Sequence, residues 1–548
     1  MAKKLALTIA GAVSLGSYEA GVMYEVLDAL GQHNTWAVEN GKPEQRIEID
    51  VLTGASAGGM TAAMTAISLL FDGASLSDPY GNPMYDAWVK EVDITKLLAR
   101  GKDENASYSL LSSDCVIGIS KAHLTPTPPP AGAPHPALAA SGKISLGLAI
   151  SNLNGVDYDR PTMTGGKFTY TRHVDQHLFH VDRGTGYVEA NWETIRATAV
   201  ACGAFPVAFR TQELLRDIED YADPYLDMTL WAGKTVLPFC YTDGGVFYNE
   251  PLGMATNLVQ ELPGGRLDGQ SRGYLFIAPK PKASDVQAGI TAANSDYKML
   301  AQGLAGAVLG QSEFQDWVMA ESFNDKLKLL DTRAAQLQGL YSANTLTAAQ
   351  TRPVNEALLS AFFTENGALQ QAKLDEARAQ LKTQYAQEYA EIKDPTQASA
   401  WLDSVLVLEL AADLHCKEEM YIYDFVADPV KLAGGGLSAF TGFFDQSYRD
   451  HDYDYGRSVG QARIAGYAAQ AGSVFDGLHW TPKEIRPIDS NLNDVPMSNV
   501  DRGKREQVRD QMLQAADDLL AELGLNVFER IGAKDLVIKK RIDKVLAL

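Results

Sequence analysis

Apolar and polar residues near the start of the chain follow a pattern that alternates between strand and helix. Residues 3–10, KKLALTIA, form a short apolar run that predicts a strand, and a helix is expected over residues 18–30. The pattern then repeats. Isoleucine and valine alternate with acidic residues over 47–51, as in a half-buried strand, and from Met60 onward apolar residues recur at helical spacing. The chain therefore opens with two strand-turn-helix units.

The second strand-to-helix turn reads Gly54-Ala55-Ser56-Ala57-Gly58, a G-x-S-x-G sequence. Glycines allow the backbone to reverse sharply, which places Ser56 between the strand and the helix. The first amides of the helix favour negative charge at this point. Ser56 is therefore a candidate nucleophile. The alternative is a helix N-cap, a role that serine fills well, and a lone G-x-S-x-G also occurs by chance.

The first strand-to-helix turn, GAVSLGS from Gly11 to Ser17, is also rich in small residues. It lacks the Lys-Ser or Lys-Thr pair of a nucleotide P-loop and the glycine spacing of a dinucleotide fold. A turn of this kind presents backbone N–H groups to an anion. With a nucleophile at Ser56, that anion would be the oxyanion of a tetrahedral intermediate. A plain tight turn is the alternative.

Residues 75–136 interrupt this alternation and are expected to be a surface insertion near the site. They contain a turn-rich stretch, an amphipathic helix in YDAWVKEVDITKLLA, and the proline-rich loop TPTPPPAGAPHP. We interpret the proline loop as a stiff connector rather than as the edge of a lid.

Strand-like sequence returns from Lys143. Strands are expected in KISLGLAISNL, GGKFTYTRH and HLFHV, followed by a helix in NWETIRATAVAC. A further apolar strand, VLPFCY, leads to Thr242-Asp243-Gly244-Gly245. An Asp before two glycines at a strand end is often only a turn. Held against a serine hydroxyl, the same carboxylate can act as a base.

Composition narrows the classes of function. The 548 residues carry 48 basic and 69 acidic side chains, a formal charge of −21. This balance argues against nucleic acid as a partner and against binding to anionic membranes through overall charge. No apolar run approaches the roughly 20 residues that cross a bilayer, and we interpret the N-terminal run as a strand rather than a signal peptide.

Histidine and cysteine spacing indicates neither a metal site nor a disulfide framework. His173, His177 and His180 fall in strand-like sequence, where the three would not share one face. The chain has four widely separated cysteines, Cys115, Cys202, Cys240 and Cys416. They form no C-x-x-C pair, and a reducing cytoplasm is the expected compartment.

Three short motifs resemble, in order and context, those of the patatin-like phospholipases: GAVSLGSYEAG at 11–21, GASAG at 54–58 and DGG at 243–245. The stretch RATAVACGAFPVAF resembles the family's segment before its aspartate motif. RGYLFIAPKP, DAWVKEVDITKLL, TGFFDQSYRDHDYDYGR and RPIDSNLNDVPMSNVDR are similar to a long bacterial branch of the family with a C-terminal helical extension. The resemblance covers most of the chain.

This resemblance implies an α/β fold with a mostly parallel central sheet between two layers of helices. It implies a lipid acyl hydrolase without cofactor or metal, in which Ser56 is the nucleophile, Asp243 is the base, and a lipid or acyl ester is the substrate. The oxyanion would be stabilised by residues of both turns, namely Gly11, Ala12, Val13 and Ala57. The remaining motif glycines are Gly16, Gly54, Gly58, Gly244 and Gly245.

One position departs from the family pattern. The family's first turn usually has a glycine triplet followed by Arg or Lys, whereas Leu15 stands at the basic position here. Backbone amides do not depend on side chains, so the oxyanion hole can persist. The departure bears instead on how an anionic head group would be bound or oriented.

The expected catalytic domain spans residues 1–285, and residues 286–548 are expected to be mostly helical because Ala, Leu, Gln and Glu dominate much of that part. At the end, DLVIKKRIDKVLAL places Ile538, Ile542 and Val545 on one helix face. This face predicts either packing on the body, which we favour, or a peripheral membrane anchor.

Two rival functions remain alternatives. An α/β-hydrolase triad would use one of the histidines downstream of Asp243, namely His415, His451 or His479. A lipid-binding or assembly protein would keep the fold without turnover. The sequence leaves the head group, acyl chain and oligomeric state open.

Overall fold

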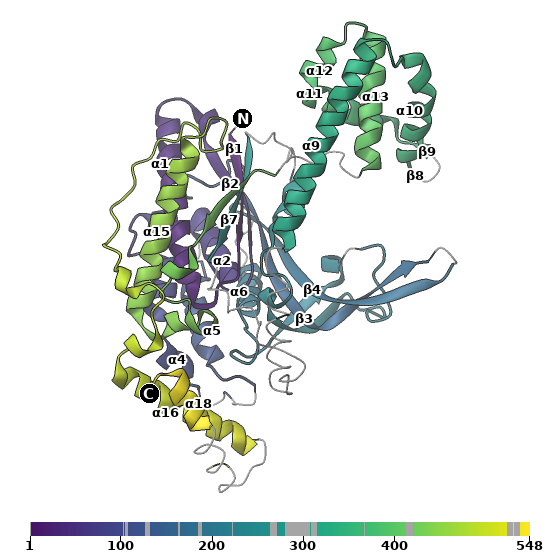
Figure 1. The fold of residues 1–548 in the computed structure, drawn as a ribbon. Helices are drawn as coiled ribbons and strands as arrows, with labels where there is room; N and C mark the ends of the chain where they lie inside the picture. Colours follow the sequence, from purple (N-terminus) through teal and green to yellow (C-terminus); the bar gives the residue numbers. More distant parts are fainter. Residues whose placement is uncertain are drawn as a thin grey trace, which may run out of the picture. The chain divides into compact units, whose positions relative to one another are not determined.

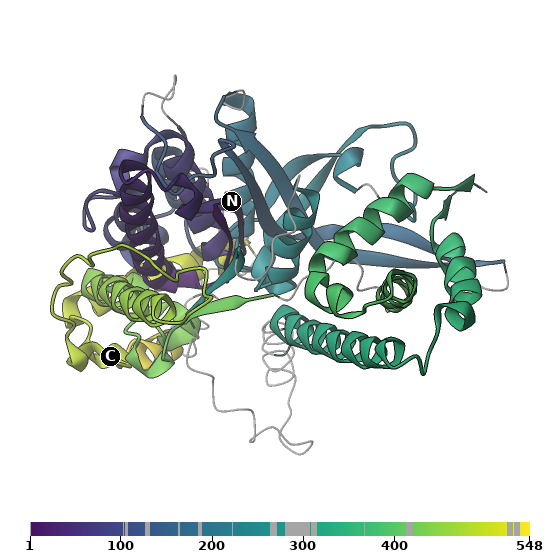
Figure 2. The ribbon, with the colours of Figure 1, turned by 90° about the horizontal axis from the view of Figure 1, so that it is seen from above.

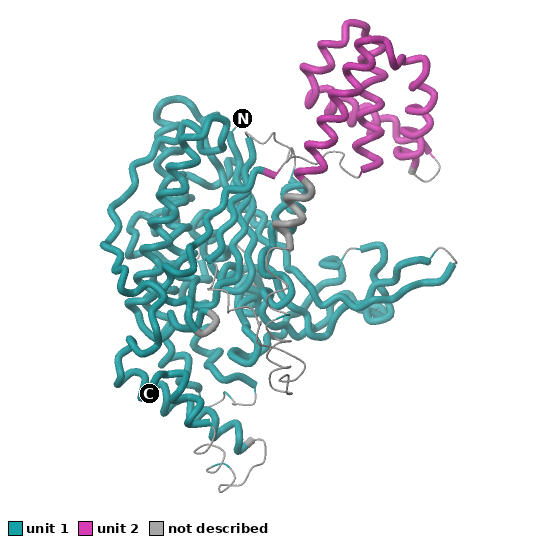
Figure 3. The backbone as a smooth tube through the Cα atoms, viewed as in Figure 1, with its two compact units in different colours: residues 1–265, 270–317, 421–548 teal, residues 266–269, 318–420 magenta. Residues whose placement is uncertain are grey.

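The computed structural model of the chain describes residues 2–101, 104, 108–126, 132–162, 165–184, 189–221, 223–262, 271–279, 307, 315–365, 368–412, 420–522, 530 and 538–548. The backbone divides into two compact units (Figure 3). Unit 1 comprises residues 1–265, 270–317 and 421–548, and unit 2 comprises residues 266–269 and 318–420.

Unit 1 is built on a mixed sheet in which most strands are parallel (Figure 1). The strands pair in the order β10-β7-β1-β2-β3-β6-β5, and β4 pairs with β3. Pairing is parallel from β10 to β3 and antiparallel where β4, β5 and β6 join. The bounds are β1 Lys3–Ile9, β2 Ile47–Gly54, β3 Lys143–Pro161, β4 Lys167–Asp182, β5 Gln212–Asp217, β6 Val236–Asp243, β7 Arg272–Ala278 and β10 Ile422–Val426. This α/β architecture confirms the predicted fold class.

The helices of unit 1 cover both faces of the sheet. Leu5, Leu7 and Ile9 of β1 point to one face and belong to a core shared with α1, α2, α6 and α15. On β3, Gly147 faces the other way and lies against Met254 of α7. The bounds are α1 Gly16–Glu39, α2 Ala57–Phe71, α3 Pro83–Tyr85, α4 Ile94–Leu98, α5 Ser113–His123, α6 Glu189–Cys202, α7 Leu252–Glu261, α14 Gly436–Ala439, α15 Gln446–Ala468, α16 Arg502–Glu522 and α18 Lys539–Val545.

Strand β2 is more deeply buried than its alternating pattern predicts. All eight residues from Ile47 to Gly54 are buried, including the two acidic ones. Glu48 pairs with Lys4 and Arg46, and Asp50 accepts two hydrogen bonds from Arg272 at 2.9 and 2.8 Å. The prediction of a half-buried strand was therefore wrong, because ion pairs from β1, β7 and the preceding loop satisfy the buried carboxylates.

Two predicted elements differ from the sequence expectation in their extent. The strands expected in GGKFTYTRH and HLFHV are one strand, β4, which pairs with β3 as far as Pro161 and Lys167 and forms a two-stranded arm (Figure 2). The helix expected in YDAWVKEVDITKLLA is broken. A π-helical turn covers Asp86–Glu91, and Asp93 then caps α4 by accepting a hydrogen bond from the Thr95 N–H at 2.9 Å.

The C-terminal part of the chain belongs to unit 1 rather than to a separate helical region. β10 is the outermost strand of the sheet path, next to β7. α15 lies beside α1 (Figure 1), so close that a Cβ on Gly21 would lie 2.1 Å from the Tyr453 carbonyl oxygen. Glu25 and Arg457, both fully buried, form an ion pair of 2.7 Å between these helices. The compact units therefore divide the chain elsewhere than at residue 285.

Unit 2 is mainly helical, as predicted for this part of the chain. Its centre is Trp401, which is fully buried and donates a hydrogen bond to the Ala334 carbonyl oxygen at 3.0 Å. The elements are α9 Gln315–Ser342, which begins in unit 1, α10 Ala348–Phe362, β8 Thr364–Glu365, β9 Ala368–Leu369, α11 Gln371–Gln384, α12 Ala386–Glu391 and α13 Pro395–Ala411. Across the described residues of both units, no helix is both long and apolar enough to span a bilayer.

Candidate active site

Strand β3 brings together two residues that lie 187 positions apart. Gly54, at the end of β2, is level with Leu148, and Asp243, at the end of β6, is level with Ile150. Because β2 runs parallel to β3 and β6 runs antiparallel, the carboxyl ends of β2 and β6 meet along β3. The two meeting points are about 7 Å apart, the rise of two strand residues. Ser56 and Asp243 therefore lie side by side.

Ser56 sits on a strained turn and points at Asp243. Its backbone has φ 50° and ψ −126°, a left-handed conformation that is costly for a residue other than glycine. The Ser56 side chain makes no capping hydrogen bond to α2. Instead, Ser56 Oγ donates to Asp243 Oδ2 at 2.6 Å. The N-cap alternative is therefore wrong, since the hydroxyl is used by the carboxylate.

Burial tunes the carboxylate. Asp243 is 2% exposed, and its second oxygen, Oδ1, accepts a hydrogen bond from the Gly245 N–H at 2.7 Å. Loss of solvent raises the pKa of Asp243 to about 7, although the hydrogen bonds from Ser56 and Gly245 pull it down. A carboxylate with this pKa is close to half-ionised at neutral pH and can accept a proton more readily than an ordinary Asp.

The first turn is packed closely against Ser56. A Cβ on Gly11 would lie 3.0 Å from Ser56 Cβ and 2.1 Å from Asn249 Oδ1, so only glycine fits. The Gly11 N–H donates to the Asn249 carbonyl oxygen at 3.0 Å. Val13 has φ 52° and begins the turn before α1. Together with Ser56 and Ala57, Val13 lines a single cavity.

The remaining motif positions sit at close contacts around this centre. Gly58, in the first turn of α2, is packed against the Ala10 carbonyl oxygen, where a Cβ would come within 2.3 Å. The other motif glycines with comparably crowded surroundings are Gly16, Gly54, Gly244 and Gly245. Leu15 is fully buried and lies near Gly434, so a basic residue at its position would be cut off from solvent. Asn249, between Gly11 and Gly245, was missed because no motif marks it.

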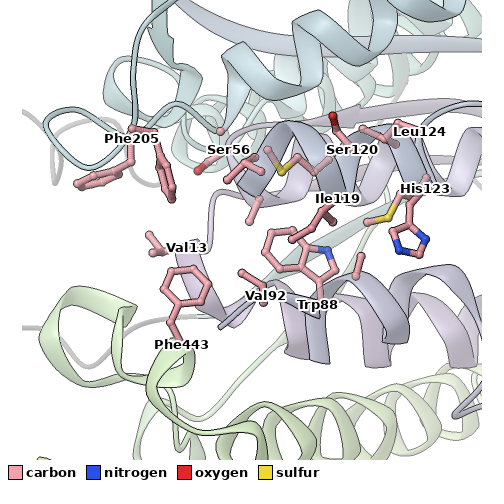
Figure 4. Close-up of a pocket in the computed structure, with 17 residues that line it drawn as sticks. Val13, Ser56, Trp88, Val92, Ile119, Ser120, His123, Leu124, Phe205 and Phe443 are labelled. Carbon is pink, nitrogen blue, oxygen red and sulfur yellow. The ribbon is translucent and has the colours of Figure 1, made fainter. Parts of the chain in front are cut away.

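An apolar pocket opens from Ser56 (Figure 4). The space between its walls, open solvent at the mouth included, is about 730 Å³. Val13, Phe205 and Phe443 lie on one side of the view, and His123 and Leu124 lie on the other. The other lining residues are Ser56, Ala57, Met60, Met64, Ala87, Trp88, Val92, Val116, Ile119, Ser120, Gly203 and Phe209. The expected insertion thus forms a wall of the pocket.

The C-terminal segment 434–449, which no motif identified as part of the site, completes the pocket. Phe443 lines it, and Ser14 Oγ in the first turn donates to the Ala439 carbonyl oxygen. The Arg449 side chain, 1% exposed, donates to the Val89 carbonyl oxygen at 2.9 Å and to those of Gly442 and Phe443 at 2.8 and 3.2 Å. One guanidinium thus ties the insertion wall to the turn that carries Phe443.

No imidazole within the described ranges contacts Ser56 or Asp243. His451 binds Asp452 and Asn493, and the ring of His479 stacks on Trp36 with centroids 3.4 Å apart. His415 lies outside the described residues. In β4, the side chains of the three histidines contact different partners: His173 contacts Asn152, His177 contacts Thr198, and His180 contacts Ser145. No group of three or more His, Cys, Asp or Glu in the described part of the chain could hold a metal ion.

Comparison with known proteins gives the class of this unit. A mixed α/β fold with a serine at a strand-to-helix elbow is typical of serine hydrolases. Residues 7–256 match the model of the patatin-like phospholipase family. This part of the chain is therefore a domain of the patatin-like phospholipase family, as the three motifs indicated.

Two individual proteins are also similar to the chain. The uncharacterized protein y4iI of Sinorhizobium fredii (strain NBRC 101917 / NGR234) is 23% identical over 354 residues, which cover 51% of this chain and 49% of that protein. The chain thus spans about half the length of this curated relative. The crystal structure of VipD from Legionella pneumophila aligns over 100% of this chain and 87% of that one, with 12% identity and a TM-score of 0.20, too low to support an argument.

Proposed function

We propose that the chain is a serine acyl hydrolase of the lipase or phospholipase A type, which cleaves lipid acyl esters through a Ser56–Asp243 dyad. The observation that carries this proposal is the 2.6 Å hydrogen bond from Ser56 Oγ, in the lining of an apolar pocket, to Asp243 Oδ2. A nucleophile needs a base within hydrogen-bond reach, and an acyl chain needs a dry, apolar channel. The match of residues 7–256 to the patatin-like phospholipase family supports a lipid acyl ester as the substrate class.

The reaction proceeds in two balanced halves. Ser56 Oγ attacks the ester carbonyl carbon while its proton passes to Asp243 Oδ2. The bond from this carbon to the alcohol oxygen then breaks, and the alcohol leaves with the proton from Asp243, so that Ser56 is acylated. Water next attacks the acyl carbon and gives a proton to Asp243. The bond to Ser56 Oγ breaks, the proton returns to Oγ, and the carboxylic acid leaves.

The two turns supply the oxyanion site in this scheme. Val13 and Ala57 line the cavity beside Ser56, and Gly11 packs on the serine. Ala57 opens α2, and the first amides of a helix have no partner within it, while Ala12 and Val13 lie at the start of the 3-10 turn Val13–Leu15 that precedes α1. We assign the amides of Ala12, Val13 and Ala57 to the oxyanion, with Gly11 shaping the turn through its bond to Asn249.

Active-site labelling with a fluorophosphonate tests the proposal. We expect one label per chain, on Ser56, with labelling lost in Ser56→Ala and strongly slowed in Asp243→Asn. Ser120→Ala is the matched control, because Ser120 lines the same pocket but donates to the Ile117 carbonyl oxygen at 2.8 Å rather than to a carboxylate. Parallel assays would follow acid release from short acyl esters and from phospholipid vesicles.

A lipid-binding protein without turnover is the second candidate, because the same apolar pocket suits an acyl chain. This second function would be established, and the first contradicted, if the folded parent protein took no label and released no acid. The parent and Ser56→Ala should then bind fatty acid with the same affinity.

A further inference from the structure

Val207 is unfavourable in two ways, through its exposed apolar side chain and through its backbone conformation. Its side chain is 71% exposed, and its backbone has φ 70°. A β-branched residue is strongly disfavoured in the left-handed region, where glycine or asparagine would fit with little strain. An exposed valine gains nothing from burial to offset this strain. Within the chain as described, no folded-state contact explains why an apolar, β-branched side chain stands here.

The strain coincides with the pocket. Among the described non-glycine residues with positive φ, the two that are β-branched are Val13 and Val207. Val13 lines the pocket, and Val207 lies between Phe205 and Phe209, which also line it. Strained backbone concentrates at functional sites when a ligand or partner benefits from it.

Two further exposed apolar side chains, Tyr108 and Leu110, lie on the loop segment that is hydrogen-bonded to the backbone at Val207. The Leu110 N–H donates to the Val207 carbonyl oxygen at 3.0 Å, and the Leu111 N–H donates to that of Ala208 at 2.8 Å. Leu110 is 37% exposed and Tyr108 is 62% exposed. We call Tyr108, Leu110 and Val207 the apolar rim.

The rim carries a cation suited to a phosphate. The guanidinium of Arg210 stacks over the Tyr108 ring, 4.9 Å from its centroid. Tyrosine and arginine are favoured at the boundary between water and hydrocarbon, because each combines an apolar body with a polar tip. The rim and Arg210 therefore present apolar groups and a phosphate partner together, continuous with the pocket.

We propose that the apolar rim is the surface that docks on a phospholipid bilayer, so that an acyl chain passes from the membrane past Val207 into the pocket. This proposal rests on the proposed acyl hydrolase function. A zwitterionic surface is the partner, since a net charge of −21 opposes approach to a strongly anionic one. The terminal helix α18 is a weaker candidate for this role, because Ile542 on its apolar face and Leu546 just beyond its end are buried, and only Val545 on that face is 43% exposed.

Vesicle flotation tests the docking surface in the Ser56→Ala background, which prevents hydrolysis of the lipid. With phosphatidylcholine vesicles, Val207→Asn is expected to lower the partition coefficient about tenfold, the loss expected when one valine no longer enters hydrocarbon. Val38→Asn is the matched control, since Val38 is 58% exposed and lies near the C-terminal end of α1, about 33 Å along the helix from the end that follows the pocket-lining Val13. Asn tolerates positive φ, so the thermal midpoint of Val207→Asn should not fall.

A direct depth measurement separates membrane insertion from contact with protein. Val207→Trp, with brominated phosphatidylcholine, should show quenched emission on vesicles, and Val38→Trp should not. Unchanged flotation of Val207→Asn, an equal loss in Val38→Asn, or unquenched Val207→Trp would each overturn docking by the rim. Hydrolysis of a soluble butyrate ester, with Ser56 intact, should be unchanged in Val207→Asn. No hydrolysis by the parent together with rim-dependent flotation would refute the hydrolase and leave docking standing.

Discussion

The site in unit 1 is built by two regions of the chain that differ in what they contribute. Residues 7–256 supply Ser56 and Asp243, the reactive groups of the proposed mechanism, on turns between regular elements. The C-terminal segment 434–449 supplies no reactive group, but it places Phe443 in the pocket and fixes the surrounding walls through Arg449. The proposed reactive groups therefore lie in short turns. The shape of the pocket depends on buried side chains that come from a distant part of the sequence.

The largest effect is expected in the reactive region. Ser56→Ala should lower kcat for a soluble ester by at least about 10⁴-fold, and Asp243→Asn by at least about 10³-fold, because the nucleophile and its base act as one unit. Steady-state kinetics on protein with unchanged circular dichroism checks this. A double variant no slower than Ser56→Ala alone would show the expected non-additivity. Activity retained in either single variant would break the distinction between the two regions.

A large effect on stability is expected in the supporting region. Arg449→Met should lower the free energy of unfolding by roughly 3–5 kcal/mol, because it leaves three buried carbonyl oxygens unpaired and weakens the compensation of Asp93, 3.8 Å away. Urea denaturation measures the loss.

The matched control is Arg502→Met, since Arg502 is 79% exposed in its pair with Glu506 and should change stability by less than about 0.5 kcal/mol. Equal losses of unfolding free energy in the two variants would mean that Arg449 stabilises the fold no more than an exposed arginine does.

Burial of Asp243 should make the free energy of unfolding fall as the pH rises. The pKa of Asp243 is about 7 in the folded protein against about 3.9 when unfolded, so the folded state holds an extra proton between these values. The stabilisation that this bound proton gives the folded state is present at low pH and is lost as the pH rises through about 7. Asparagine does not titrate, so Asp243→Asn does not lose this stabilisation. The difference in free energy of unfolding, variant minus parent, should therefore be roughly 2–3 kcal/mol greater at pH 8 than at pH 5. Denaturation at both pH values checks this, and a difference of opposite sign would contradict it.

The smallest effect is expected from reshaping the pocket. Phe443→Leu enlarges the mouth without removing its apolar character, so we expect KM for long acyl esters to change a few-fold while kcat for a butyrate ester stays within twofold. Leu330→Ile in unit 2 is a control for a conservative core change away from the pocket lining. A fall in kcat with both chain lengths would place Phe443 among the groups that position the dyad.

The candidate residues of the site that are encoded locally could be predicted from the sequence. Gly11, Ser56 and Asp243 could be chosen as candidates because each lies at or just after the end of a strand, in a tight turn before a helix. Their mutual distance could not be derived from spacing, since it depends on β2 and β6 meeting along β3, a pairing between distant strands.

The supporting region was not predictable in the same way. Arg449 and Phe443 lie in a stretch that resembles a soluble helix and its preceding turn. Their importance arises from contacts with distant parts of the chain, since Arg449 bonds the Val89 carbonyl oxygen and Phe443 lines the pocket. Likewise, the short run Ile422–Val426 gives too weak a pattern to reveal a strand of the main sheet. Glu48 and Asp50 suggested an exposed strand face because Lys4 and Arg272, which form ion pairs with them, lie outside the local sequence.

In the proposed mechanism Asp243, and no histidine, activates Ser56. The decisive measurement is the pH dependence of the rate at which a fluorophosphonate labels Ser56. The rate should rise tenfold per pH unit below an apparent pKa of about 7 and then level off, lose this dependence in Asp243→Asn, and keep it in His451→Gln. A titration that persists in Asp243→Asn, or that disappears in His451→Gln, would contradict the dyad.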